Sequence, residues 1–129
     1  MKVQSKLGVT IPVPYKVYTA LLTQTGTNDP VATVLENTLG FNINITRTAG
    51  IPYVYYSFTA DGDTFDLTKT TFELENLRTS GNSLGLYKRV SSHPNTEIRI
   101  NPVVQTASTQ TFEDWDAITT AKVEIIVYP

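Results

Sequence analysis

The stretch Tyr15–Gly40 constrains the fold of this chain more than any other, because it predicts a long β-hairpin. Two extended runs, Tyr15–Gln24 and Val31–Asn37, flank residues 25–30, where Gly, Asn, Asp and Pro each favour a turn. The first run is apolar on both alternating faces, which is typical of a central strand covered above and below. We therefore predict a long inner strand whose hairpin partner sets its register. One face of this strand holds Tyr15, Val17 and Leu21, and the other holds Tyr18, Ala20 and Leu22.

Alternation of apolar and polar residues continues through the rest of the chain, interrupted by turn signals such as Asp61-Gly62-Asp63, which predicts a hairpin. We predict an all-β fold: an antiparallel β-sandwich of jelly-roll-like form with about eight strands. Thr111–Asp114 resembles a helix start, so at most one short helical turn is expected, near 111–118, which would carry Phe112, Trp115 and Ile118 toward the body. The further predicted strands are Phe41–Thr48, Ile51–Thr59, Thr70–Leu77, Leu84–Val90, Glu97–Val104 and Ala121–Tyr128. The residues predicted to face the core are Ile43, Ile45, Val54, Tyr56, Phe58, Ile98, Ile100, Val123 and Ile125.

The length of 129 residues predicts one sandwich domain, residues 15–129, large enough to bury a core without disulfides or metal. Residues 1–14 form a separate feature, because Pro12 and Pro14 interrupt ladder pairing on either side of Val13. This segment is interpreted either as an extended N-terminal arm that packs on a neighbouring subunit or as an edge strand.

Composition excludes several classes of function. The chain has no cysteine, so thiolate catalysis and cysteine-ligated zinc are excluded. Its 10 Lys and Arg and 12 Asp and Glu give a net charge of −2, and the cations are scattered, which disfavours a nucleic-acid footprint. The N-terminal segment lacks the apolar core of a signal peptide, and no run reaches the length of a membrane span. We therefore expect synthesis in the cytoplasm, no membrane partner and no nucleic-acid partner.

The loop from Asp61 to Asp66 contains the residues that could hold a metal. Asp61, Asp63 and Asp66 could supply oxygen ligands to calcium, although the spacing does not match an EF-hand loop. Asp-Gly is also a common way to make a tight turn, so a solvated turn is the favoured interpretation. The single histidine, His93, has no orienting acid or nucleophile that the sequence can assign to it. We expect no cofactor and no catalytic residue.

Aromatic and apolar residues on outward-facing positions supply the candidate binding surface. Tyr53 and Tyr55 alternate with the predicted core residues of their strand, so they require a cover, which could be a second layer, a subunit interface or a ligand. Ile126 and Tyr128 leave the outer side of the last strand partly apolar. We expect the two pairs to join in one patch that self-association would cover. Tyr53, Tyr55 and Trp115 could instead form a stacking platform for a surface glycan.

Two parts of the chain carry a resemblance to a known class of proteins. They are the stretch YKVYTALLTQTGTNDPVATVLENTLG, in particular Lys16–Gln24 and Pro30–Gly40, and the ending VEIIVYP, which closes on Val127–Pro129. These segments resemble small β-rich proteins encoded among the structural genes of bacteriophages. The resemblance implies a virion-associated structural protein, such as a head fibre, a capsid decoration or a tail-fibre module. It supplies no catalytic residues.

The expected function is therefore that of a non-enzymatic bacteriophage virion protein that acts through protein–protein assembly. Its expected partners are other virion proteins and further copies of the same chain, in a closed homo-oligomer such as a trimer. Its expected location is the virion, after synthesis in the host cytoplasm. The alternative is a carbohydrate- or receptor-binding β-sandwich module that uses the surface aromatics.

Overall fold

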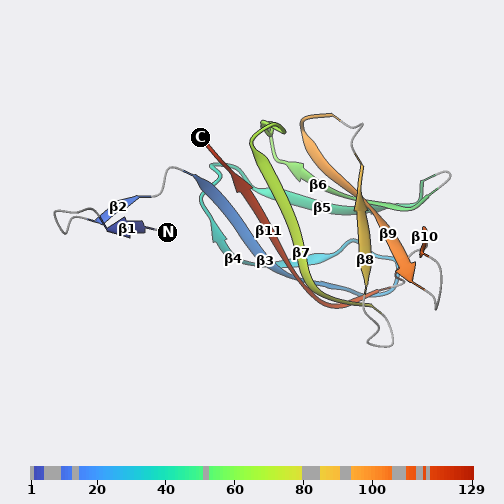
Figure 1. The fold of residues 1–129 in the computed structure, drawn as a ribbon. Coiled ribbons are helices and arrows are strands. Elements are labelled where there is room, and N and C mark those ends of the chain that lie inside the picture. Colours follow the sequence, from blue (N-terminus) through green and yellow to red (C-terminus); the bar gives the residue numbers. More distant parts are fainter. Residues whose placement is uncertain are drawn as a thin grey trace.

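The computed structural model describes residues 2–4, 10–12, 15–50, 53–79, 85–90, 94–105, 110–112, 115 and 117–129. Within these residues every regular element is a β-strand (Figure 1). The strands are β1 (Lys2–Gln4), β2 (Thr10–Pro12), β3 (Lys16–Gln24), β4 (Val31–Asn37), β5 (Ile43–Thr48), β6 (Tyr55–Ala60), β7 (Thr70–Thr79), β8 (Leu86–Arg89), β9 (Glu97–Gln105), β10 (Gln110–Phe112) and β11 (Ile118–Val127).

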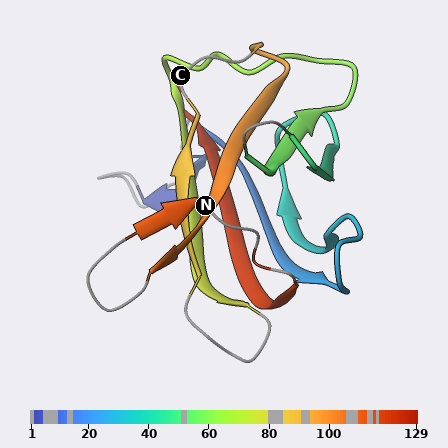
Figure 2. The same cartoon turned by 90° about the vertical axis from the view of Figure 1, so that its right-hand side faces the viewer.

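Nine of these strands form two antiparallel sheets that lie as two layers (Figure 2). The first sheet has the order β4-β3-β11-β7. In the second, β5, β6 and β9 lie in that order, and β8 and β10 also pair with β9. Strands β6 and β8 both pair with Ile100, so they occupy opposite edges of β9. The predicted all-β antiparallel sandwich is confirmed.

Strand β3 lies inside its sheet, as predicted, with β4 on one edge and β11 on the other. Its inward residues Tyr18, Ala20 and Leu22 are almost fully buried. The expected cover over both faces is formed only in part, because on the outer face Val17 is 9% exposed but Leu21 is 44% exposed. An apolar residue on the second face of a strand is therefore not sufficient to predict a further layer of protein.

The core fills the space between the two sheets and contains the residues that alternation predicted. Ile45, Ile98, Ile100, Val123 and Ile125 are buried, and Ile43 packs against them while partly exposed. The same holds in β6, where Tyr56 and Phe58 are 1% exposed. Aromatic contacts join the two layers, since the rings of Phe58 in β6 and Phe72 in β7 lie 4.9 Å apart.

One local prediction differs from the structure. Residues Asp61-Gly62-Asp63 do make a turn, with Gly62 at φ +72°, but they do not close a hairpin. Strand β6 pairs with β5 and β9, while β7 belongs to the other sheet, so this turn begins a crossing between layers. The described residues of 111–118 form no helical turn, since Thr111 and Phe112 belong to β10 and Ile118 begins β11, which agrees with the expected limit of at most one such turn.

The N-terminal segment contains strands β1 and β2, which pair with each other in antiparallel register. Among the described residues, this two-stranded sheet is hydrogen-bonded to neither of the larger sheets. Whether residues 1–14 act as an arm toward a neighbouring subunit stays a prediction.

The two sides of the sandwich, one near β7 and one near β4, differ in the contacts that join the two layers. At the β7 side, the Gly85 N–H donates to the Leu77 carbonyl at 2.9 Å, and a Cβ at Gly85 would lie 2.6 Å from the Leu77 Cγ. Gly85 therefore lies so close to the Leu77 side chain that a side chain at position 85 would overlap it unless Leu77 moved. At the β4 side, the Arg47 N–H of β5 donates to the Asp29 side chain at 2.9 Å, in the turn before β4.

Candidate functional site

Trp115 is a core residue, so its predicted place on a surface stacking platform is wrong. Its side chain is 3% exposed, and its ring lies 4.9 Å from the ring of Tyr56. The indole Nε1 donates to the carbonyls of Leu86 at 2.9 Å and Val103 at 3.3 Å. A buried indole N–H needs such an acceptor, and carbonyls of β8 and β9 supply it.

Tyr53 and Tyr55 differ in exposure. Tyr53 is 43% exposed, whereas the Tyr55 ring is partly buried beneath the Arg99 guanidinium, whose Cζ lies 4.1 Å from the ring centroid. The same guanidinium pairs with Glu97, with Nη2 and Oε1 2.5 Å apart. Arg99 and Glu97 both project from β9 beside β6. The cover that Tyr55 requires is therefore partly supplied by a charged side chain of the neighbouring strand.

Ile126 and Tyr128 lie on the other sheet, and the expected joined patch with Tyr53 and Tyr55 is not formed. Tyr55 begins β6, whereas the Tyr128 N–H donates to the Lys69 carbonyl, in the segment that follows the far end of β6. The two pairs therefore belong to different sheets, Tyr55 to β6 and Ile126 to β11. Tyr128 is 45% exposed and packs against Tyr15, with ring centroids 5.8 Å apart, while Ile126 is partly buried.

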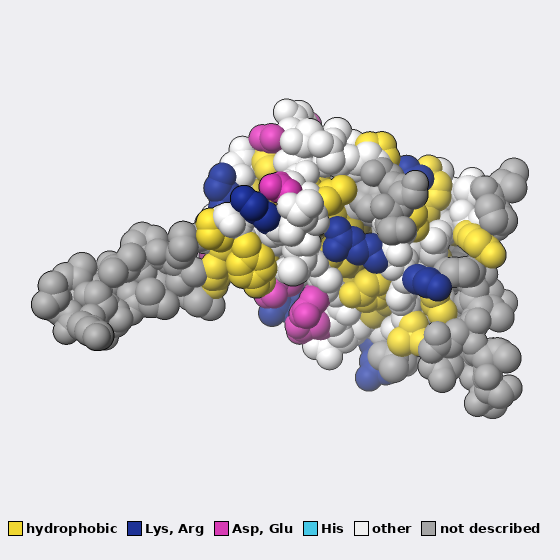
Figure 3. Space-filling view, turned by 45° about the horizontal axis from the view of Figure 1, so that its top comes forward, with side chains coloured by type: hydrophobic (Ala, Val, Ile, Leu, Met, Phe, Trp, Pro, Cys, Tyr) yellow, Lys and Arg dark blue, Asp and Glu magenta, His cyan; other side chains and the backbone are white. Residues whose placement is uncertain are grey.

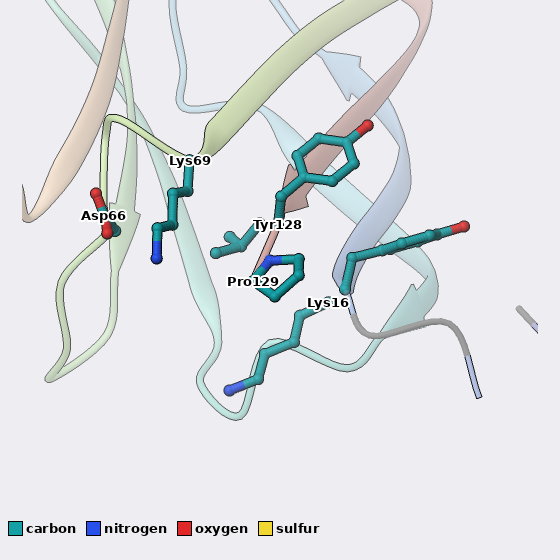
Figure 4. A pocket seen from close by; sticks show the side chains of 7 residues that line it. Lys16, Asp66, Lys69, Tyr128 and Pro129 are labelled. Atoms are coloured by element: carbon teal, nitrogen blue, oxygen red, sulfur yellow. The ribbon is translucent and has the colours of Figure 1, made fainter. Parts of the chain in front are cut away.

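An open pocket of about 520 Å³ lies beside Tyr128 (Figure 4). The side chains of Lys16 and Lys69 lie on either side of Pro129 there, and hydrophobic side chains adjoin Lys and Arg side chains at this end of the molecule (Figures 3 and 4). Asp66 is at the rim, and hydrogen bonds from the Thr68 hydroxyl and N–H hold the pKa of its carboxyl below the usual value, aided by the charge of Lys69. The pocket offers two cations and two aromatic rings to a ligand. Its lining residues are Tyr15, Lys16, Asp66, Lys69, Val127, Tyr128 and Pro129.

Two of the three carboxylates that were candidates for calcium accept hydrogen bonds from nearby threonines. Asp63 accepts a hydrogen bond from the Thr64 N–H at 2.8 Å, and Asp66 accepts one from the Thr68 hydroxyl at 2.6 Å. In the part of the chain that the structure describes, no three acidic or histidine side chains are grouped in a way that could hold a metal ion. His93 lies outside the described residues.

The most exposed apolar surface was not predicted from the sequence. Of the six large hydrophobic side chains exposed among the described residues, four lie on the β3–β4 hairpin. We call these four the β4 edge patch: Leu21 at 44%, Val31 at 65%, Val34 at 52% and Leu35 at 57% exposure. The signal was present in the run Val31-Ala32-Thr33-Val34-Leu35, which does not alternate with polar residues as a strand with one solvated face should.

No family model, curated protein or solved structure matches the chain. The resemblance of Lys16–Gln24, Pro30–Gly40 and Val127–Pro129 to bacteriophage structural proteins therefore stays a prediction based on those segments. The described residues include no helix that is long and apolar enough to cross a membrane.

Proposed function

We propose that this protein is a non-enzymatic structural protein of a bacteriophage virion, such as a fibre, a capsid decoration or a tail accessory. It acts by protein–protein assembly, both with further copies of itself and with other virion proteins. The proposed class follows from the resemblance of two segments, Lys16–Gln24 and Pro30–Gly40, to small phage structural proteins. In the fold these segments are β3 and the region around β4, so they include the most exposed apolar surface.

The observation that supports assembly is the β4 edge patch. Single exposed apolar residues are ordinary on protein surfaces, but a group of them on one element marks an interaction site. Val31, Val34 and Leu35 are each more than half exposed along this edge. Leu21, opposite Thr33, shares the outer face with Val31, whereas Val34, opposite Ala20, points to the other face of the same edge. Removing such surface from water stabilises an assembly by about 25 cal/mol for each Å² of apolar area.

Sedimentation velocity on the intact chain tests the proposed assembly. We expect an oligomer at tens of micromolar, because the β4 edge patch would otherwise stay in water. A monomer across this range would contradict the proposal. The virion assignment has its own test: the gene should lie among head or tail genes, and mass spectrometry should detect the chain in purified particles.

A further inference from the structure

We propose that β4 of one chain pairs antiparallel with β4 of a second copy, about a two-fold axis that passes beside Thr33. This inference rests on the proposed function, because it specifies the surface through which the protein self-associates. Pairing of this kind would join two four-stranded sheets into one continuous sheet across the dimer.

The first observation is that β4 has a free edge. Among the described residues it pairs with β3 alone, and its burial pattern is exposed at six of seven positions. The β7 edge of the same sheet is different, because the Gly85 N–H caps the Leu77 carbonyl there. A free edge presents N–H and C=O groups that only another extended chain or water can satisfy.

The register of the β3–β4 ladder shows which backbone groups point outward. The Thr38 N–H donates to the Val17 carbonyl at 2.8 Å, so odd-numbered residues of β3 direct their backbone groups toward β4. Leu21 and Thr23 are therefore bonded to their partners Thr33 and Val31. The residues between, Ala32 and Val34, direct their N–H and C=O groups to the free edge.

The sequence of β4 is complementary to itself when two copies meet about Thr33. In that register Ala32 opposes Val34 of the partner subunit, so the outward-directed residues of each chain face those of the other and can exchange backbone hydrogen bonds. Val31 opposes Leu35 of the partner subunit, and both are among the most exposed apolar residues. Leu35 is the extra residue where the β3–β4 register shifts, so its side chain is displaced from the regular ladder.

Charge also agrees with this register. Glu36 is the one charged residue of β4, and it falls opposite Pro30 of the partner subunit. The two Glu36 carboxylates then lie on opposite sides of the axis, six residues apart along the paired strands, or about 20 Å. No like charges meet, and the contacts at the centre are apolar or threonine side chains. A second copy therefore satisfies the hydrogen-bonding, apolar and charge requirements of this edge.

A single cysteine at the axis tests the geometry directly, because the chain has no native cysteine. Thr33 would face Thr33 of the partner subunit in a non-hydrogen-bonded pair, with Cα atoms about 4.5 Å apart, which a disulfide can span. We expect Thr33→Cys to form a disulfide-linked dimer under mild oxidation. The matched control is Thr71→Cys, an exposed threonine on β7 at the other edge of the same sheet. Equal cross-linking of the two variants would overturn the proposal.

Charge substitutions at the opposed pair test the register. Val31→Lys with Leu35→Lys places like charges opposite each other, and we expect loss of the dimer in light scattering. Val31→Lys with Leu35→Glu places opposite charges there, and we expect the dimer to be retained. Circular dichroism should show that both double variants keep the wild-type β spectrum. Equal dissociation of both double variants would overturn the register.

These outcomes separate the inference from the proposed function. A wild-type oligomer that persists in the double-lysine variant would overturn pairing through β4 but leave assembly as the proposed function. If the wild-type chain stays monomeric and the Thr33→Cys variant forms no cross-link, both the pairing through β4 and the proposed assembly would be overturned. If the Thr33→Cys variant is monomeric alone but binds an extended segment of another virion protein along β4, the partner of this edge is that protein, and pairing with a second copy is overturned.

Discussion

At the scale of single residues, two buried tyrosine hydroxyls have opposite surroundings. The Tyr56 hydroxyl donates to the Gln24 Oε1 at 2.7 Å, between the two sheets. The Tyr18 hydroxyl is buried with no hydrogen-bond partner. A buried polar group without a partner costs free energy, whereas a paired one stabilises the fold by about 1 kcal/mol. The same chemical change should therefore have opposite effects at the two positions.

We expect Tyr56→Phe to lower the free energy of unfolding by about 1–2 kcal/mol, because it leaves the Gln24 amide oxygen unpaired. Tyr18→Phe removes an unpaired hydroxyl and should leave stability unchanged or raise it by up to about 1 kcal/mol. Urea denaturation of the two variants measures both effects. A larger loss from Tyr18→Phe than from Tyr56→Phe would contradict this account.

Burial also predicts the behaviour of the protein in alkali. Desolvation raises the pKa of Tyr18 and of Tyr87 above the ordinary value of 10.0. Above that value the unfolded chain releases phenolic protons that the folded chain retains, so stability falls as the pH rises. We expect the free energy of unfolding to decline from about pH 10 upward. The decline should be shallower in a variant with Tyr18→Phe and Tyr87→Phe, as measured by urea denaturation at several pH values.

At the scale of elements, β3 shows how much adjacent residues of one strand can differ. Leu22 points between the sheets and is 1% exposed, whereas Leu21 points outward and is 44% exposed. Alternation along a strand sends neighbours to opposite faces, and only one face of this sheet borders the core. The alternation itself was visible in the sequence, but the exposure of the second face was not.

We expect Leu22→Ala to cost about 2–5 kcal/mol, from lost transfer free energy and the cavity that remains. Leu21→Ala should cost the monomeric chain less than about 1 kcal/mol, because its side chain is already partly in water. The pair shares residue type, strand and substitution, so thermal unfolding at low protein concentration isolates the effect of burial. Similar losses at both positions would show that the outer face is covered.

At the scale of the whole molecule, the two sides of the sandwich have different roles. Near β7, Gly85 brings the chain against Leu77 and joins the layers by a backbone hydrogen bond. Near β4, the layers are joined by side-chain contacts from the preceding turn, and the strand itself keeps a free edge. One side is thus closed within the chain, and the other is available to a partner.

We expect Gly85→Ala to destabilise the fold by about 1–3 kcal/mol, because the new methyl would overlap the Leu77 side chain and displace one layer. Gly62→Ala supplies a contrast, since nothing lies within 4 Å of a Cβ there and only the positive φ of +72° resists the change. Its cost should be about 1 kcal/mol. Melting temperatures of the two variants measure these costs. Gly85→Ala reports the overlap with Leu77, and Gly62→Ala reports the backbone strain in the turn.

Local features of this protein could be predicted from its amino-acid sequence alone. Alternation with a period of two depends only on neighbouring residues, so it identified Ile98, Ile100, Val123 and Ile125 as core residues and predicted both strands of the β3–β4 hairpin. The Asp61-Gly62 turn was found for the same reason, since a glycine at positive φ is a local requirement.

Which strands become neighbours, and which faces remain in water, depends on the packing of distant parts of the chain. The turn at Asp61 could close a hairpin or begin a crossing, and the choice depends on β9, which occupies the other edge of β6. Trp115 packs against Tyr56 in the core, and the carbonyls that accept from its indole N–H belong to Leu86 and Val103, which are distant in the chain. Val31, Val34 and Leu35 are exposed because no strand covers the edge of β4 among the described residues. These outcomes depend on contacts between residues far apart in the chain, and local alternation contains no information about such contacts.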